Sequence, residues 1–107
     1  MSLDVALKAL VYTNIYEDNT THNLHRMAKE AGLYQYLWHP REISITRAEQ
    51  LIEPLEDGLA RLRSDPERFR KFNAENGHGK FEDLVFFVEN YLEACKKNPD
   101  AMVEVRV

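Results

Sequence analysis

Apolar and polar residues alternate at both ends of this 107-residue chain, and this alternation restricts the fold more than any other feature of the sequence. The apolar positions are Leu3, Val5, Leu7, Ala9 and Val11 at the start, and Val103, Val105 and Val107 at the end. A period of two residues is typical of a half-buried β-strand. The pattern therefore predicts strands over residues 2–12 and 101–107. We expect the two strands to pair with each other, because their apolar faces match.

Four segments between these strands carry apolar residues at helical spacing, which predicts helices. The expected ranges are residues 21–31, 46–62, 64–72 and 80–97. Thr46 and Glu49 have the spacing of a capping box at the start of the second helix, and Pro54 is expected to kink that helix. A two-stranded ribbon is marginal by itself, so helices must cover one of its faces. The sequence thus predicts one α+β domain over residues 1–107, in which a small antiparallel sheet from the terminal strands is covered by three to four helices.

The composition indicates which classes of partner and which cellular compartment to expect. The net charge is −4, with 14 basic residues interleaved among 18 acidic ones, so no nucleic-acid partner is expected. Cys95 is the only cysteine and lies on an apolar helical stripe, which predicts inert core and a reducing, cytoplasmic setting. The N-terminal segment lacks a basic lead and a long apolar run, so neither a signal peptide nor a membrane span is expected. No cofactor is predicted.

A dense polar run, residues 17–23, precedes the first predicted helix and is interpreted as a loop. Capping that helix needs one oxygen, so the remaining polar groups are surplus. A helix N-terminus favours anions such as phosphate. Neutral hydrogen-bond donors and a histidine suit a sugar or base attached to that phosphate. The predicted ligand-binding residues here are Asn19, Thr20, Thr21, His22, Asn23 and Arg26. The structural alternative is a solvated loop that supplies one cap.

Two further segments are candidates for the same site. In the loop over residues 73–80, Asn76 and His78 stand among glycines before a helix, although an Asn-Gly turn explains the same residues. Trp38 is interpreted either as filling of the core or as a stacking platform for a base, with Arg41 for a phosphate. No metal site is predicted, because the spacing of His22 and His25 is matched by no third ligand.

Several stretches together resemble a family of small proteins encoded by tailed phages and prophages. They are "MSLDV", "NTTHNLHRMAKEAGLYQYLWHPREI", "AEQLIEPLEDGLARL" and "NGHGKFEDLVFFVENYLEACKKNPDA". Two positions depart from the pattern of that family: Thr20 stands in place of an isoleucine, and His78 in place of a tryptophan between the glycines. The resemblance implies phage origin and expression in the bacterial cytoplasm, and it brings no activity that can be carried over.

The expected function is that of a phage accessory protein that binds a small anionic, nucleotide-derived ligand and so sequesters a host defence signal. One alternative is an inhibitor that binds a host protein through a helical surface. Another is an enzyme that cleaves a nucleotide signal, with His22 as general acid or base and His25, His39 or His78 as its partner. A homodimer or higher oligomer is expected, because the sheet leaves its edges open and Phe86, Phe87 and Tyr91 add surplus aromatic surface.

Overall fold

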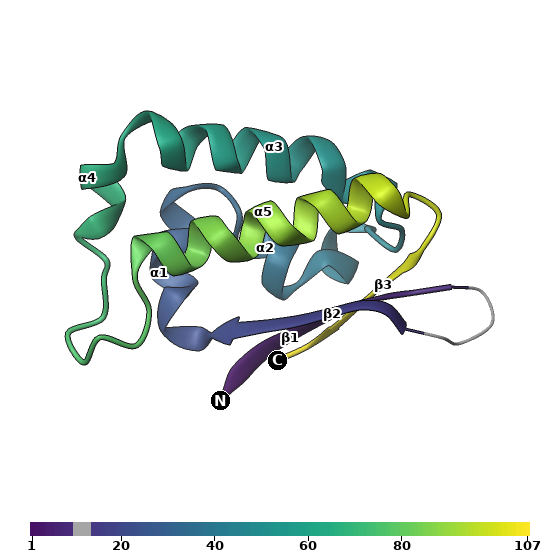
Figure 1. Ribbon diagram of the computed structural model, residues 1–107, viewed down its shortest axis with the longest axis horizontal. Coiled ribbons are helices and arrows are strands. Elements are labelled where there is room, and N and C mark those ends of the chain that lie inside the picture. The colour runs from purple at the N-terminus through teal and green to yellow at the C-terminus, as the bar shows by residue number, and fades with distance from the viewer. Residues whose placement is uncertain (10–13) are drawn as a thin grey trace.

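The computed structural model describes residues 1–9 and 14–107, and it confirms the predicted α+β class. Three strands form one layer, and the helices cover one of its faces (Figure 1). In chain order the elements are β1 (Ser2–Lys8), β2 (Asn14–Thr21), the 3-10 helix η1 (His22–Leu24), α1 (His25–Glu30), α2 (Tyr34–Trp38), the 3-10 helix η2 (Pro40–Ile43), α3 (Glu49–Ser64), α4 (Pro66–Arg70), α5 (Phe81–Lys97) and β3 (Met102–Arg106).

The two terminal strands pair as predicted, with β1 in the middle of a sheet whose strand order is β2-β1-β3. Both pairings are antiparallel, and Val5 lies opposite Val105 in β3 and opposite Asp18 in β2. The inward-facing Leu3, Val5 and Leu7 are all buried. The predicted first strand extended to residue 12, but residues 10–13 lie outside the described part of the chain.

The interpretation of residues 17–23 as a loop was wrong, because most of this polar run belongs to the strand β2. Its backbone pairs with β1 over nearly its whole length, from Thr21 opposite Ser2 to Asn14 opposite Lys8. Pairing with a central strand overrides the weak intrinsic strand preference of Asn and Asp. Since β2 lies at an edge of the sheet, its polar side chains also discourage unselective pairing with other strands.

The expectation that Phe86, Phe87 and Tyr91 add surplus aromatic surface was wrong for two of the three. Phe87 and Tyr91 are buried in the core, whereas Phe86 is 66% exposed. Tyr91 stacks on Tyr16 of β2, with ring centroids 6.0 Å apart and planes within 10° of parallel. The helix α5 is therefore fixed against the edge strand as well as against α3.

Local details at two other helices differ from the prediction. Residues 34–38, for which no helix was predicted, form the short helix α2. The capping box of Thr46 and Glu49 does not form. Instead the side-chain oxygen of Gln50 accepts hydrogen bonds from the backbone N–H groups of Thr46 and Arg47 at 2.8 and 2.9 Å. Pro54 lies inside α3 as expected.

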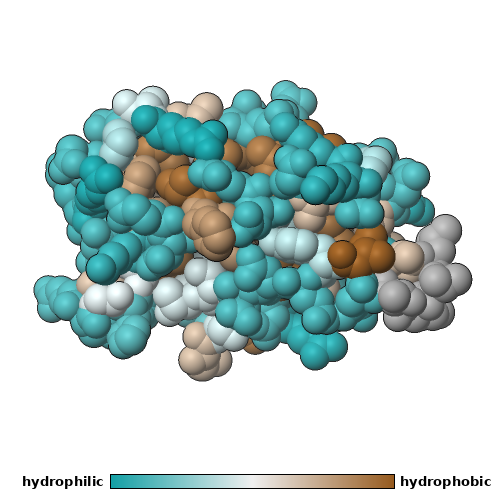
Figure 2. All heavy atoms as spheres, in the orientation of Figure 1, coloured by the Kyte–Doolittle hydropathy of each residue, from teal (hydrophilic) through white to brown (hydrophobic). Residues whose placement is uncertain are grey.

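The surface on the side of α5 is largely hydrophilic, with apolar side chains reaching it over and beside that helix (Figure 2). Large apolar residues with substantial exposure include Phe86 on α5 and Ile15 on β2. Within the described residues, no helix combines the length and the apolar character that crossing a membrane requires.

Gly58 provides a test of the packing between α3 and the segment before α2. A Cβ atom at this position would lie 2.2 Å from a methyl group of Leu33, which is fully buried. In an exposed helix, Gly→Ala stabilises by up to about 1 kcal/mol. Here overpacking outweighs that gain, and we expect Gly58→Ala to lower the free energy of unfolding by about 1–3 kcal/mol. Urea denaturation measures the change, and an unchanged or raised midpoint would contradict this packing.

Tyr91 provides a test in which the substitution is expected to stabilise the fold. Its hydroxyl is buried and has no hydrogen-bond partner among the described residues, and burial raises its pKa well above the ordinary value. Since an unpaired buried hydroxyl is costly, we expect Tyr91→Phe to stabilise the fold by about 1 kcal/mol. Tyr34→Phe is the matched control: the hydroxyl of Tyr34 lies 3.2 Å from Nε2 of His39, so its removal should destabilise. Thermal melts that rank the two variants the other way would refute this account.

Candidate functional site

The two polar segments singled out in the sequence meet in space. The side-chain amide of Asn23 donates a hydrogen bond to the carbonyl of His78 at 2.8 Å. A Cβ atom on Gly79 would lie 3.2 Å from side-chain carbons of both Thr21 and Asn23. Gly79 also has φ = 126°, a conformation that side chains rarely adopt. The glycine therefore lets the loop before α5 lie directly on the end of β2.

A pocket of about 390 Å³, here called the junction pocket, lies where these segments meet the first turns of α5. Its lining brings together four of the predicted site residues, namely Asn19, Thr20, Thr21 and His78. The lining consists of Asp18, Asn19, Thr20, Thr21, Gly77, His78, Gly79, Asp83, Phe86 and Phe87. Sequence reasoning missed the residues of α5 in this list, because it treated residues 17–23 as a loop and so had no strand beside that helix.

A second hollow, of about 470 Å³, continues along the same two elements toward the C-terminal end of α5. Asp18 lines both hollows. The other residues of the second are Ile15, Tyr16, Glu17, Asn90, Glu93, Ala94, Lys97 and Asn98. Both hollows lie between β2 and α5, which run side by side (Figure 1), and their linings share Asp18, so they are treated together as one depression. We call this depression, which includes the junction pocket, the β2–α5 groove.

Negative charge dominates the β2–α5 groove. Its lining contains the acidic residues Asp18, Asp83 and Glu93, against one lysine, Lys97. Carboxylates repel anions, and a helix N-terminus that already carries Asp83 has part of its anion-attracting field offset. The groove therefore favours a cationic group over the anionic ligand predicted from the sequence.

Asp18 is held firmly at the centre of the groove. Its Oδ1 accepts a hydrogen bond from the backbone N–H of Asn19 at 2.8 Å, and its Oδ2 accepts one from the hydroxyl of Tyr16 at 3.1 Å. Burial and the neighbouring carboxylate raise the pKa of Tyr16 far above its ordinary value, so its hydroxyl remains a donor. The carboxylate thus has a fixed direction without a cationic partner among these contacts.

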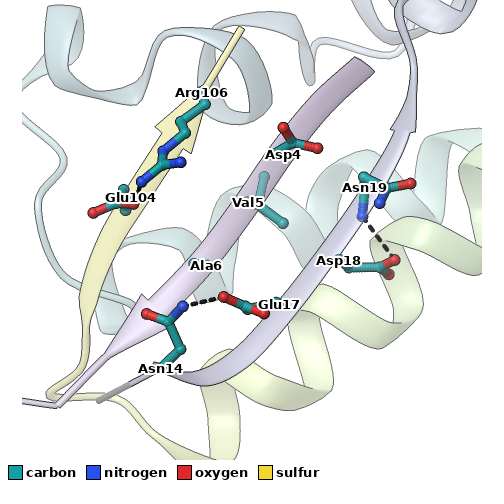
Figure 3. A pocket seen from close by; sticks show the side chains of 9 residues that line it. All are labelled: Asp4, Val5, Ala6, Asn14, Glu17, Asp18, Asn19, Glu104 and Arg106. Atoms are coloured by element: carbon teal, nitrogen blue, oxygen red, sulfur yellow. Dashed lines mark hydrogen bonds and ion pairs between the residues drawn. The ribbon is translucent and has the colours of Figure 1, made fainter. Parts of the chain in front are cut away.

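The outer face of the sheet carries a further polar hollow of about 460 Å³, whose lining shares Glu17, Asp18 and Asn19 with the groove (Figure 3). Its charged groups are largely paired with one another. Glu104 accepts from Lys8 at 2.6 Å and lies 3.4 Å from Arg106, Asp4 accepts from the hydroxyl of Ser2, and Asn14 donates to Glu17. No large exposed apolar residue lines this hollow. The β2–α5 groove offers both charge and apolar surface, and is the stronger candidate.

The predicted stacking platform is not on the surface. Trp38 is 3% exposed, packs in the core, and donates a hydrogen bond from Nε1 to Nδ1 of His22 at 2.9 Å. The neutral imidazole that accepts this bond carries its proton on Nε2. The Nε2 atom is itself buried and has no partner among the described residues. The structure therefore uses His22 and Trp38 for packing, not for a base or phosphate.

The remaining predicted residues lie apart from the groove. Arg26 on α1 and Arg41 on η2 are exposed and line neither the groove nor the outer hollow. Asn76 accepts from the backbone N–H of His78 at 2.9 Å, and Gly77 donates to the carbonyl of Ala74 at 3.1 Å. These contacts make residues 74–77 the Asn-Gly turn that was the structural alternative. Thr21, which lines the junction pocket, also supplies the cap of η1, because its hydroxyl oxygen accepts from the backbone N–H of Asn23 at 3.2 Å.

The histidines predicted as partners for His22 do not assemble around it for catalysis. His25 bonds through Nδ1 to the carbonyl of His22, not to its ring. His39 lies between the hydroxyl of Tyr34 and the carboxylate of Glu42, 3.4 Å away, but these three residues line none of the hollows described above.

Neither a metal cluster nor a reactive thiol is found in the described chain. Across residues 1–9 and 14–107, no group of three or more His, Cys, Asp or Glu residues is placed to hold a metal ion. Cys95 is fully buried, and burial raises the pKa of its thiol to about 12, which confirms its interpretation as inert core.

The bond between Trp38 and His22 can be tested by stability. Replacing His22 by Ala leaves the buried indole N–H without its acceptor, and we expect His22→Ala to lower the free energy of unfolding by about 1–3 kcal/mol. His78→Ala is the control, because the exposed ring of His78 makes no hydrogen bond within the described residues and its loss should be nearly neutral. Equal melting temperatures for the two variants would contradict the structural role of His22.

Comparison of the chain with protein-family models, with curated proteins and with solved structures found no match. The resemblance to small phage proteins is consequently untested by these comparisons. What can be concluded about function rests on the groove and on its neighbouring residues.

Proposed function

We propose that this chain is a non-catalytic binding protein whose partner is another protein, held in the β2–α5 groove. The observation that carries the proposal is the combination of an elongated groove with exposed apolar side chains along it. Phe86 is 66% exposed beside the junction pocket, and Ile15 is 43% exposed at the other end. Exposed large apolar residues rimmed by polar ones are typical of surfaces that bind proteins.

The shape and chemistry of the groove support a macromolecular partner better than a small substrate. Its two hollows are open and follow most of β2, so they suit a partner that makes many weak contacts along one line. The described histidines are engaged in packing, in turns or at the surface, without a nucleophile and base facing a common cavity. General acid–base catalysis requires that geometry. The proposal therefore corresponds to the alternative of a host-protein-binding inhibitor.

A small ligand is a second candidate, because Asn19, Thr20, Thr21 and His78 converge on the junction pocket. The anionic, nucleotide-derived ligand remains a proposal, and the carboxylates of Asp18 and Asp83 weigh against its charge. Titration with ATP and with a cyclic dinucleotide, followed by calorimetry, tests this candidate directly. Heat of binding that His78→Ala abolishes would favour it over a protein partner.

The setting that we propose is the bacterial cytoplasm, in a cell that carries a phage or prophage. The resemblance of the sequence to phage-encoded proteins supports this setting, as does a single buried cysteine that needs no oxidising compartment. Binding a host protein there would fit an accessory role during infection. Self-association into a homodimer remains part of the proposal.

Site-directed photocrosslinking in cells of the native host tests the protein-binding role. We expect a photoreactive benzoylphenylalanine in place of Phe86 to form discrete protein adducts. The same probe in place of the exposed Glu53 on α3, away from the groove, should form none. Adducts of equal yield from both positions would contradict a partner specific to the groove.

A blocking variant sharpens this test. Asn90→Trp places a large ring in the middle of the groove and should abolish the adducts formed from position 86. Ala60→Trp, at an exposed position of α3, is the matched control and should leave them unchanged. Circular dichroism of both purified variants establishes that each is folded. Persistence of the adducts in folded Asn90→Trp would show that the partner does not lie in the groove.

A further inference from the structure

The two edges of the sheet are not equally open. At the β3 edge, the N–H of Val103 donates to the carbonyl of Thr46 at 2.8 Å, and Arg47 pairs with Met102, so the segment before α3 covers the start of that strand. Within the described residues, β2 pairs only with β1. The open edge of the sheet is therefore the one that borders the β2–α5 groove.

The free backbone groups of this edge can be assigned by alternation. In an antiparallel pair, every second residue directs its N–H and C=O away from the neighbouring strand. The N–H of Asn19 donates to the side chain of Asp18, so it belongs to the outward row (Figure 3). Glu17 and Thr21, two residues to either side, then belong to the same row. These three residues offer a ladder for one more strand.

The charge of the groove selects the chemistry of that strand. Asp18, Asp83 and Glu93 line the groove beside this edge, whereas Lys97 is the one lysine of the lining. An incoming segment with basic side chains on the face toward α5 would be attracted by these carboxylates, and the aliphatic stems of those side chains could cover part of the exposed ring of Phe86. Acidic segments would be repelled.

We propose that an extended, basic segment of the partner protein adds to the outer edge of β2 as a fourth strand and lies in the β2–α5 groove. This inference rests on the proposed function and names the form and charge of the partner. Addition of a peptide strand to an exposed edge beside a helix is an established mode of recognition, in which the backbone provides affinity and alternate side chains provide specificity.

Asp18 makes the addition selective. In the free protein its carboxylate accepts a hydrogen bond from the N–H of Asn19, which is one of the outward donors. A carbonyl of the incoming strand takes that N–H and releases Oδ1 of Asp18, which then needs a new partner. A basic side chain supplies one through a charge-assisted hydrogen bond. A strand without a cation would leave the partly buried carboxylate poorly paired.

A second copy of this chain fits the edge less well than a basic partner does. If two β2 strands paired, Glu17 and Asp18 of both copies would lie close together. Like charges on neighbouring strands destabilise a sheet. The proposal therefore commits to a basic segment of another protein, and self-pairing is one outcome that the experiment can detect.

The probe is a capped octapeptide of alternating valine and arginine, added to the full ¹⁵N-labelled chain. Ile15–Thr21 spans about 23 Å as a strand, which such a peptide covers. We expect the amides of Glu17, Asn19 and Thr21 to shift and to become protected from hydrogen exchange. A peptide with glutamate in place of arginine should not bind.

Two methylated peptides separate strand addition from attraction between charges. N-methylation of one alternate set of peptide nitrogens removes the donors that face β2 and should abolish binding. Methylation of the other set leaves the facing donors intact and should preserve it. Equal binding by both methylated peptides would mean attraction between charges alone and would overturn the proposal.

Asp18→Asn tests whether the carboxylate of Asp18 selects basic strands, because the amide oxygen can still accept hydrogen bonds but carries no charge. We expect the affinity for the arginine peptide to fall by about tenfold or more. Asp57→Asn, the same change at an exposed position of α3, should leave it unaltered. Equal affinities for the two variants, with a native spectrum for both, would overturn the role of Asp18.

Two further outcomes count against the proposal. Protection of Glu17, Asn19 and Thr21 without peptide, together with dimers in sedimentation, would mean that a second copy occupies the edge. Absence of binding by the arginine peptide, despite adducts from position 86, would mean that the partner lies in the groove in another form. The second outcome overturns the strand inference and leaves the proposed function standing, whereas absence of adducts removes the function itself.

Discussion

The rest of the structure depends on the central position of β1. This strand pairs on both sides, and its inward residues Leu3, Val5 and Leu7 are buried against the helices. Because both of its edges are occupied, its own backbone groups need no further partner. The polar strand β2 and the short strand β3 both pair with β1, so this strand orders two segments whose own sequences specify a strand only weakly.

The second constraint is the contact between β2 and α5. Tyr16 stacks on Tyr91 and Phe87 packs beside it, so an aromatic layer joins the edge strand to the helix. This layer lies between the two elements, and shorter polar side chains such as Asp18, Thr20 and Asn90 line the hollows beside it. A groove results because the aromatic rings set the separation of strand and helix while the residues beside them do not fill it.

The sequence predicted those elements whose periodic apolar residues are the ones buried in the core. The terminal strands and α5 have one apolar face each, and the core uses those faces. The strand β2 was missed because its partner, not its composition, makes it a strand: Asp18 faces the helices and Glu17 the outer side, which leaves no apolar period to recognise. Of the candidate site, the sequence identified the polar residues of β2 and His78. It noted Phe86 as surplus aromatic surface but could not assign Asp83 or Phe86 to this site, because nothing in the pattern placed α5 beside residues 17–21.

Trp38 and His22 illustrate a different limit. Trp38 was noticed as the only tryptophan and His22 as part of a polar run, and the two form a hydrogen bond with each other instead of facing a ligand. A polar residue near an aromatic one has the same signature in a sequence whether the pair faces a ligand or faces itself. Only the burial of the pair distinguishes a ligand site from a core contact, and burial depends on how all the elements of the chain pack together.

The sheet order also has a consequence for how the chain folds. The strands β1 and β2 are neighbours in sequence, whereas the pairing of Val5 with Val105 closes a loop of nearly the whole chain. Closing a long loop is entropically costly before its contacts form, and contacts between distant residues slow folding. The hairpin of β1 and β2 can therefore form early, and β3 joins only after the helices have brought the chain back. During that interval the second edge of β1 is open, and it is the place where a misplaced strand from another molecule would enter.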